Sequence, residues 1–583
     1  MTKTRDLANL ANGVTSANIV DGAITNVDVN NSAGITSSKF NFTQSGTGAT
    51  TRTVESKLRD VVSVKDFGAV GDGVTDDTAY FAAAFAALNA ATKPLALYIP
   101  AGNYLVNPNT CNITTSYRSV FGDGLASRII VPSSGNGISV NGTSDTVHLT
   151  NVAIYNLSVV ASGWTGTGGT NAIQINKANN CSVTKCFVEG VNPVFSWEQG
   201  IILRDTNSCL IANNVIRYVK GNGISLDLLL GTEDTKGNLV TGNTIADVGD
   251  SGIGFHNNVR YSAAIGNNIN NPGQGAGTGI DIAGCNYCLF KGNVISNSGQ
   301  YGIRLLQNLS YRTVDNVVTG NTIYHPSTAG EFGAITIDNT ERNTITYNRI
   351  LGNSATLSNR AIFITYSSTG TNTHPITGES LYKIRGTVIA NNTVDRFEYG
   401  TVFDAAGGIT GATLSLDNNV FQSCDYGIVF NTGVSEIRFT TYGHNTFLNC
   451  TTNVVSINSG IVQNGDPLSE LLTTTPVNVS TTGSETDVTS LALPAISGQN
   501  VSLVATHRVS EVGAYDGRIN YKDSTGATLA ADTFGEVTNS LRPLTVPFIS
   551  SGLLVVTIEK SGPGPFTGTV DCNGLYLTKY TYY

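Results

Sequence analysis

The sequence predicts an all-β protein built around a parallel β-helix, a solenoid of short stacked strands. Two short phrases alternate along the chain between about residues 120 and 465. One is Gly-Ile or Ala-Ile, which recurs every 23 to 39 residues, and the other is Asn-x-Ile, Val or Phe, which recurs every 24 to 44 residues. Apolar and polar residues alternate with period two, which favours strands over helical repeats. We therefore expect one coil of two or three strands, repeated with insertions.

The composition agrees with a β-rich protein and excludes several classes of function. The chain has 64 glycines but only 13% charged residues, and its net charge is −9 without any basic run. Nucleic acid is therefore not expected as a partner. No run of about 18 apolar residues predicts a membrane-spanning helix. The opening stretch MTKTRDLANLANG lacks the apolar core of a signal peptide, so we expect synthesis in the cytoplasm without the usual export.

Residues 1–60 differ from the rest of the chain. Val14, Ile24 and Ile35 fall 10 and 11 residues apart, each followed by Thr. A single apolar strip on a polar chain cannot bury itself, which favours an extended, self-associating segment. The alternative interpretation is a flexible polar tail.

Residues 61–119 predict a cap for the first coil. Asp76 or Asp77 can cap a helix that starts near Thr78, and the strand that follows is expected to turn at Gly102. The acidic cluster that Asp72 completes is interpreted as a turn and helix cap, not as a catalytic site. Three apolar residues share one face of the helix: Phe81, Phe85 and Leu88.

The cysteines follow the repeat and predict a structural ladder. Small residues stand five positions before the repeat Asn in successive coils: Cys209, Asn238, Ser262, Cys288, Asn316 and Asn343. Cys181 holds the same position in an earlier coil. Exchange of Cys, Asn and Ser at one position indicates stacking at a turn. The CNYC stretch at 285–288 is therefore interpreted as structural, and we expect no metal site, no cofactor and no disulfide framework.

The repeat stops near residue 465, at a boundary rich in Thr, Ser and Pro. Residues 466–583 carry alternating strands such as NVSLVATHRV and GLLVVTIEKSG. They predict a separate antiparallel β-sandwich, with trimerisation or glycan binding as its role.

One stretch resembles a known superfamily. Residues 64–106, VKDFGAVGDGVTDDTAYFAAAFAAL to YIPAGNYLV, resemble the N-terminal signature of pectate-lyase-like right-handed parallel β-helices. The leader, the long β-helix and the terminal strands together resemble a bacteriophage tailspike. This resemblance implies a homotrimer in the virion, mounted on the phage tail or an adaptor through its N-terminus. It also implies binding, and often cleavage, of a bacterial surface polysaccharide.

The outward face of the strands opened by Gly-Ile carries the candidate catalytic residues. The second apolar residue of each strand is expected to point inward: Leu203, Leu226, Phe255, Ile282, Leu305 and Ile337. Its neighbours then place Arg204, Asp227, His256, Asp281 and Arg304 on one outward strip. Asp227 and Asp281, two coils or about 10 Å apart, form our first hypothesis for the acid and base of a glycosidase, with His256 between them. The alternative is a set of solvated polar residues.

Two further mechanisms remain open from the sequence. Glu233, on the loop after Asp227, could supply the second carboxylate of a hydrolase. A polysaccharide lyase would instead use His256 as the base and Arg204 or Arg304 to hold a uronate carboxylate. A spike that binds its receptor without catalysis is the alternative from another class.

Other residues are candidates for binding the substrate. Trp197 and Glu198 precede the Gly200 strand, and Trp197 could serve as a sugar platform, with core or interface packing as the alternative. Asp338 lies on an outward position of a later coil. Tyr366 begins the long insertion before Asn392, which could form one wall of a groove.

Overall fold

The structure is a computed structural model, in which the chain forms two compact units, Met1–Val62 and Ser63–Tyr583. Apart from the C-terminal strands given below, it describes residues 29–30, 33–144, 147–164, 169–192, 196–228, 235–273, 277–308, 311–324, 332–353, 358–365, 384–404, 412–431, 437–456 and 461–463.

The first unit contains a small hairpin. Strand β1 (Asn41–Thr43) pairs antiparallel with β2 (Thr51–Thr53), beside the short helices η2 (Ser37–Lys39) and α2 (Val54–Leu58). Thr53 caps α2, because its hydroxyl accepts the backbone N–H of Ser56. Val14 and Ile24, which carry the predicted apolar repeat, lie outside the described residues, so self-association stays a prediction.

The predicted helix lies near the start of the second unit. Helix α3 (Thr78–Ala90) begins where Asp76 accepts the backbone N–H of Thr78 at 2.9 Å. The buried carboxylate of Asp77 accepts two further backbone N–H groups, which confirms the structural interpretation of this acidic cluster. The predicted apolar face is buried, as Phe81, Phe85 and Leu88 show. Two other short helices are η3 (Val64–Phe67) and η4 (Gly124–Ala126). No helix in the described residues is long and apolar enough to cross a membrane.

The predicted strand with a turn at Gly102 is wrong in one respect. Strands β5 (Leu95–Ile99) and β6 (Gly102–Leu105) belong to different sheets, so the chain turns a corner of the solenoid between them. Gly102 is the first residue of the second strand. A side chain does not fit there, because a Cβ would lie 3.0 Å from both the Gly71 carbonyl oxygen and the ring of Tyr104.

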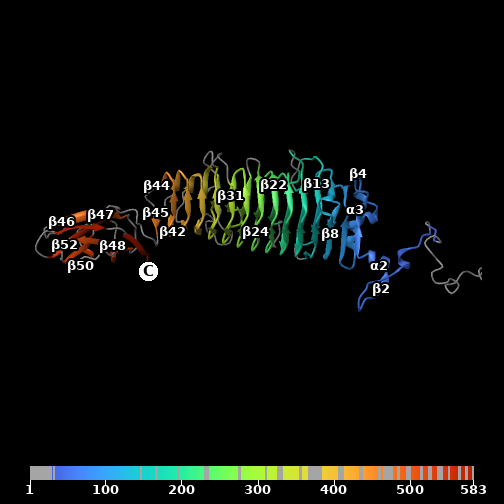
Figure 1. The fold of residues 1–583 in the computed structure, drawn as a ribbon, viewed down its shortest axis with the longest axis horizontal. Helices are drawn as coiled ribbons and strands as arrows, with labels where there is room; N and C mark the ends of the chain where they lie inside the picture. Colours follow the sequence, from blue (N-terminus) through green and yellow to red (C-terminus); the bar gives the residue numbers. More distant parts are fainter. Residues whose placement is uncertain are drawn as a thin grey trace, which may run out of the picture. The chain divides into compact units, whose positions relative to one another are not determined.

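Three long parallel sheets run the length of the solenoid (Figure 1). Sheet 1 contains β7 (Cys111–Ile113), β10 (Ile138–Asn141), β14 (Asn171–Asn179) with the short β11 (Leu149–Thr150), β17 (Gln199–Asn207), β20 (Asn222–Asp227), β23 (Ile253–His256), β26 (Thr278–Ala283), β29 (Tyr301–Leu306), β32 (Gly333–Asp338), β35 (Ser358–Thr365), β38 (Phe397–Asp404), β41 (Tyr426–Phe430) and β44 (Thr452–Ser456).

Sheet 2 contains β5 and then β8 (Arg118–Gly122), β12 (Ala153–Tyr155), β15 (Ser182–Thr184), β18 (Leu210–Ala212), β21 (Leu239–Thr241), β24 (Ala263–Ile265), β27 (Leu289–Lys291), β30 (Val317–Thr319), β33 (Thr344–Thr346), β36 (Arg385–Ala390), β39 (Ala412–Asp417), β42 (Ile437–Gly443) and β45 (Ile461–Gln463). The strand β3 (Val61–Ser63) falls on the boundary between the two units.

Sheet 3 contains β4 (Asp72–Asp76), β6, β9 (Ser127–Val131), β13 (Ser158–Ala161), β16 (Phe187–Glu189), β19 (Val215–Arg217), β22 (Thr244–Val248), β25 (Asn268–Pro272), β28 (Val294–Ser296), β31 (Thr322–Tyr324), β34 (Arg349–Leu351), β37 (Thr393–Asp395), β40 (Val420–Gln422) and β43 (Thr446–Leu448). Each coil therefore passes through sheets 1, 2 and 3 in turn, which confirms the parallel β-helix.

An asparagine ladder fixes the corner between sheets 2 and 3. The repeat Asn of each coil accepts the backbone N–H of the repeat Asn before it, and its own side-chain amide donates across the stack. The ladder runs through Asn214, Asn243, Asn267, Asn293, Asn321, Asn348, Asn392, Asn419 and Asn445. Nearly all of these side chains are buried, so each supplies partners for backbone groups that water cannot reach.

The predicted ladder of small residues forms at the corner between sheets 1 and 2. Cys181 donates its backbone N–H to Cys209, and Cys209 donates to Asn238. The backbone N–H of Asn238 donates to the hydroxyl of Ser262, and the backbone N–H of Cys288 donates to the side-chain oxygen of Asn316. This confirms that these cysteines are structural.

The C-terminal strands pair antiparallel in two sheets. One contains β46 (Val477–Thr481), β53 (Phe566–Asp571), β48 (Val501–Glu511), β51 (Arg542–Phe548) and β54 (Leu575–Tyr580), and the other contains β47 (Thr486–Leu493), β52 (Gly552–Ser561), β49 (Asp516–Lys522) and β50 (Thr528–Phe534). The sandwich and its role stay predictions.

The asparagine ladder gives the first testable prediction. Asn267→Ala removes the acceptor for the backbone N–H of Asn243 and leaves buried groups without partners. We expect it to lower the free energy of unfolding by about 1–3 kcal/mol, measured in urea. The control is Asn268→Ala, because Asn268 is the next residue along the chain and its side chain is exposed on β25. Equal stability of the two variants would contradict the role of the ladder.

Candidate functional site

The core-facing row of sheet 1 is the one that the sequence predicts. Leu203, Leu226, Phe255, Ile282, Leu305 and Ile337 are paired in register from strand to strand. All six are fully buried. The residues on either side of this row therefore project from the outer face of the sheet.

The predicted outward strip is in fact two rows, one on each side of the core-facing row. The first outward row holds Ile202, Ser225, Gly254, Asp281, Arg304 and Thr336, and the second holds Arg204, Asp227, His256, Ala283, Leu306 and Asp338. Asp227 and Asp281 thus differ by two coils and by one row, or about 12 Å between backbones. The expectation of a single strip was wrong because alternation along a strand leaves two outward positions per coil.

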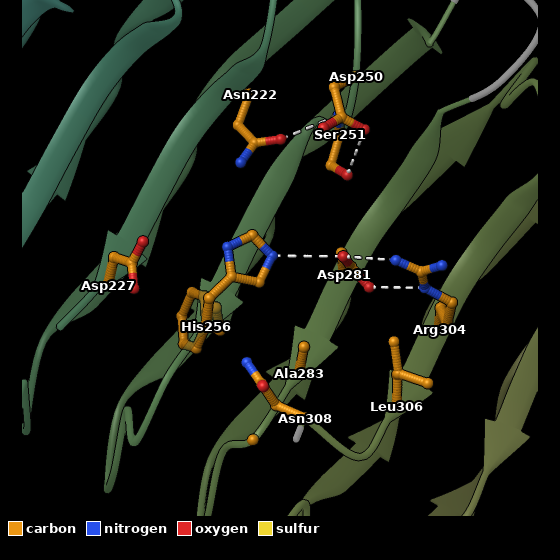
Figure 2. Close-up of polar contacts among 12 residues, drawn as sticks. Asn222, Asp227, Asp250, Ser251, His256, Asp281, Ala283, Arg304, Leu306 and Asn308 are labelled. Carbon is orange, nitrogen blue, oxygen red and sulfur yellow. Dashed lines mark hydrogen bonds and ion pairs between the residues drawn. The ribbon is translucent and has the colours of Figure 1, made fainter. Parts of the chain in front are cut away.

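His256 crosses from the second row to the first to meet Asp281. Its Nε2 lies 3.3 Å from Oδ2 of Asp281, and Figure 2 shows the imidazole lying between Asp227 and Asp281. Arg304 binds the same carboxylate from the next coil, with Nε 2.9 Å from Oδ1 and Nη2 2.8 Å from Oδ2. Asp281 is therefore held from both sides by a two-pronged guanidinium and an imidazole.

These contacts set the charges of the cluster. Burial alone would raise the pKa of Asp281, but the bonds and charges of His256 and Arg304 hold that pKa well below its usual range. Burial alone would lower the pKa of His256, but the hydrogen bond and charge of Asp281, with smaller contributions from Asp227 and Asp250, raise it overall. Asp281 is therefore a carboxylate, and His256 favours its protonated form more than an ordinary histidine does.

Gly254 makes room for the imidazole. A Cβ at this position would lie 2.5 Å from Cε1 and 3.0 Å from Nε2 of His256. It would also lie 3.0 Å from the amide nitrogen of Asn222, whose oxygen accepts the backbone N–H of Ser251. The missing side chain in the first row is thus what allows a second-row histidine to reach Asp281.

Asp227 is held by the turn that follows β23. Its Oδ1 accepts the side-chain amide of Asn257 at 2.7 Å and the backbone N–H of Leu228 at 2.8 Å. Asn308 in turn donates to the amide oxygen of Asn257. Asp227 is partly exposed, and among the described residues both hydrogen bonds to its carboxylate are accepted by Oδ1, which leaves Oδ2 without a partner in that part of the chain.

Arg204 stands in register beside Asp227 on the neighbouring strand. Arg204 is half-buried, and this burial lowers the pKa of its guanidinium. The charges of Asp227 and Asp205 raise the same pKa by a smaller amount, so the pKa is lowered overall. Its side chain makes no ion pair within the described residues, in contrast to Arg304, which Asp281 occupies. Arg204 is therefore a cation of the cluster that Asp281 does not bind.

The remaining predicted residues do not join the cluster. Trp197 is fully buried, donates to the Gly135 carbonyl and packs edge-on against Trp164. The prediction of Trp197 as a sugar platform is therefore wrong, and the alternative of core packing is confirmed. Glu198 precedes β17 and lies about 20 Å along the strand from Arg204. Asp338 is buried four coils beyond Asp227. Glu233 and Tyr366 lie outside the described residues.

Several residues of the cluster were missed from the sequence. Asn257 donates to the carboxylate of Asp227, and Asn222 accepts the backbone N–H of Ser251. Gly254 leaves room for the imidazole of His256. The signals were a glycine inside a strand and an Asn-Asn pair at its end, where Asn257 and Asn258 both have positive φ.

The described residues contain no group of three or more His, Cys, Asp or Glu side chains that could hold a metal ion. Cys285 and Cys288 of the CNYC stretch are buried and donate to backbone carbonyls of neighbouring coils. Burial raises the pKa of Cys288 to about 12, so its thiol stays protonated near neutral pH.

Two family models match the chain. Residues 61–304 match rhamnogalacturonase A/epimerase, pectate lyase-like, and residues 262–452 match the right-handed β-helix region. The protein is therefore a pectate-lyase-like right-handed β-helix protein, a fold of carbohydrate-active proteins. The first match contains every described residue of the cluster apart from Asn308.

Comparison with solved structures finds partial similarity at low sequence identity. The A-module of a mannuronan C-5 epimerase from Azotobacter vinelandii is 18% identical, with a TM-score of 0.46 over 69% of this chain and 99% of that one. The catalytic unit of a GH87 α-1,3-glucanase from Streptomyces thermodiastaticus is 20% identical, with a TM-score of 0.45 over 69% of each chain. Tailspike protein 3 of bacteriophage CBA120 is 13% identical, with a TM-score of 0.44 over 83% of this chain and 73% of that one. No curated protein sequence matches the chain.

Gly254 gives a prediction about the charge of His256. In Gly254→Ala the new methyl group displaces the imidazole from Asp281, so the pKa of His256 falls. Nuclear magnetic resonance of ¹³C-labelled histidine measures this pKa directly. The wild-type protein, titrated under the same conditions, provides the reference. An unaltered pKa of His256 would contradict the proposed packing.

The His256–Asp281 pair also predicts how stability depends on pH. Because folding raises the pKa of His256, its contribution is complete below about 6.5 and is lost as pH rises through the raised pKa. Because folding lowers the pKa of Asp281, its contribution is complete above about 3.9 and is lost at more acidic pH. The stability lost in His256→Gln should therefore be greatest near pH 5–6 and smaller near pH 9, as measured by urea unfolding at each pH. A pH-independent loss would exclude the ion pair.

Proposed function

We propose that the protein binds a bacterial surface polysaccharide and cleaves it by hydrolysis at the outer face of sheet 1. The observation that carries this proposal is the convergence of Asp227, His256 and Arg204 there. Among the described residues, Oδ2 of Asp227 has no hydrogen-bond partner. His256, which Asp281 binds, stands on the neighbouring strand with its imidazole between the two carboxylates (Figure 2). The pectate-lyase-like match over these coils supports a carbohydrate as the substrate.

The charges assign a role to each group. The raised pKa of His256 suits it to give a proton to the glycosidic oxygen as the bond to the anomeric carbon breaks. Asp227 takes a proton from water, whose hydroxyl group then bonds to that carbon. Arg204 contributes hydrogen bonds to sugar oxygens.

Asp281 takes a different role from the one that the sequence predicts. A carboxylate whose pKa lies well below its usual range, and whose two oxygens are bound by Arg304 and His256, can neither donate a proton nor readily take one. We assign it as the residue that positions and charges His256. The hypothesis of Asp227 and Asp281 as acid and base is therefore replaced by His256 and Asp227.

A polysaccharide lyase is the second candidate, favoured by one observation. Arg204 is half-buried without an ion pair in the described part of the chain, which suits it to hold a uronate carboxylate. His256 would then remove the proton beside that carboxylate, in its neutral form. Arg304, the other cation considered for this role, is occupied by Asp281.

The biological setting is also part of the proposal. We infer a bacteriophage tailspike that forms a homotrimer, attaches to the tail or an adaptor through residues 1–60 and acts in the virion during adsorption to the host. The resemblance of residues 64–106 and the order of leader, β-helix and antiparallel C-terminal strands support it. The alternative is a spike that binds the polysaccharide without cleaving it. The contacts of Asp281 favour this alternative over a hydrolase that uses two free carboxylates, because they leave Asp281 bound to other side chains.

Asp227→Asn tests the catalytic role. It should lower the rate of polysaccharide cleavage by about 10²- to 10⁴-fold while binding is retained, because the amide cannot accept a proton from water. The control is Asp247→Asn on β22, where Asp247 likewise accepts an asparagine amide at 2.7 Å but lies on sheet 3. Equal activity of the Asp227 variant and the wild type would overturn the assignment.

The products distinguish the two reactions. Hydrolysis adds one water per cut, which mass spectrometry of the fragments detects, whereas a lyase leaves an unsaturated sugar that absorbs near 235 nm. We expect the first result from incubation with purified capsular and O-antigen polysaccharides. Unsaturated fragments would move the reaction to His256 and Arg204, and intact polymer that still binds would leave a non-catalytic spike.

A further inference from the structure

A row of exposed side chains runs along the corner between sheets 1 and 2, one residue before the ladder of small residues. The row consists of Asn180, Ser208, Gly237, Tyr261, Tyr287, Asp315 and Arg342. Each member donates its backbone N–H to the next coil, and all of them have φ between 50° and 66°. The row, which we call the ridge, is therefore one continuous line of equivalent backbone positions, stacked at the spacing of the coils.

Two tyrosines of this ridge stack on each other in solvent. The rings of Tyr261 and Tyr287 lie 5.1 Å apart and are inclined by only 7°. Tyr261 is 62% exposed and Tyr287 is 49% exposed. Beyond Tyr287 the ridge continues with Asp315 and Arg342, which are joined by two hydrogen bonds of 2.8 Å.

The opposite end of the stack faces a missing side chain. Gly237 occupies the ridge position before Tyr261, so no side chain of the row covers the outer face of the Tyr261 ring. The backbone does not require glycine, because Ser208, Tyr261 and Asp315 adopt the same positive φ with side chains. Space does not require it either, since a Cβ at Gly237 would come no closer than 3.6 Å to Ser208.

We propose that this vacant position is a sugar-binding slot, in which a hexopyranose of the polysaccharide stacks on the outer face of Tyr261. The proposal rests on the proposed function and names a contact beyond its catalytic cluster. Coils rise by about 4.8 Å, which matches the separation of two rings in contact. A sugar ring at the level of Gly237 would thus continue the stack. Its slightly positive C–H groups would meet the negative face of the aromatic ring.

The surroundings of the slot suit a carbohydrate. Lys236 precedes Gly237 and is exposed, and it pairs across the coils with Arg260, which precedes Tyr261. Ammonium and guanidinium groups donate hydrogen bonds to sugar hydroxyls and to acidic substituents. The slot also lies in the coils that carry Asp227 and His256, because Tyr261 follows His256 by five residues. The slot and the catalytic cluster therefore belong to the same coils.

Filling the slot tests the proposal without removing any contact of the folded protein. In Gly237→Leu a side chain takes the place of the sugar above Tyr261. The matched control is Gly320→Leu at the corner between sheets 2 and 3, where φ is +63° and a Cβ meets nothing within 4 Å. Both are made together with Asp227→Asn so that the polysaccharide stays intact, and binding is measured on an array of purified capsular and O-antigen polysaccharides, then by interferometry.

We expect Gly237→Leu to weaken binding of the polysaccharide by roughly tenfold, or about 1.4 kcal/mol, and Gly320→Leu to leave it unchanged. If Gly237→Leu does not fold by circular dichroism, Tyr261→Ala decides, with the exposed Tyr347→Ala as its control. Unchanged binding in Gly237→Leu or Tyr261→Ala overturns the slot while the proposed function stands. Absence of binding to every polysaccharide by the Asp227→Asn protein overturns the proposed function and the slot with it.

Discussion

Every feature of the solenoid depends on one constraint, the stacking of equivalent residues at the spacing of parallel strands. Each coil offers backbone groups that only the next coil can satisfy, and the buried asparagine ladder does so at the corner between sheets 2 and 3. Insertions between coils can vary in length because the ladder restores the register after each one. The same constraint decides which outward side chains can meet.

The register of the strands determines which side chains of the candidate site come into contact. His256 and Asp281 belong to different outward rows, and they meet only because Gly254 leaves the space between them open. Arg304 stands one coil further in the row of Asp281 and closes the other side of the carboxylate. A buried ion pair of this kind costs desolvation, which is compensated when both partners are well bonded. In the function that we propose, this pair keeps the imidazole oriented and charged beside Asp227.

Much of the fold could be predicted from the sequence because the repeat fixes the register of each coil. The Gly-Ile phrase correctly identified Leu226 and Phe255 as core residues, and exchange of Cys, Asn and Ser correctly indicated a ladder. The site was predicted only in part. Sequence alternation does not distinguish the two outward rows, and it gives no sign that Arg304 occupies Asp281.

Trp197 shows a second limit of reasoning from sequence. It precedes a strand opened by Gly-Ile and could have faced outward, but its positive φ accompanies a ring that lies entirely within the core. Positive φ at a non-glycine residue is rare enough that a pattern of apolar residues does not predict it. The ridge with Tyr261 was missed for the same reason, since its corner positions all adopt this conformation.

We propose that the outer face of sheet 1 around Asp227 and His256 acts on a polysaccharide. A crystal structure of the Asp227→Asn protein with a bound oligosaccharide fragment tests this most directly. We expect a glycosidic oxygen within hydrogen-bond reach of the His256 imidazole, with Arg204 in contact with the same sugar chain. An oligosaccharide bound on another face, with this cluster untouched, would contradict it.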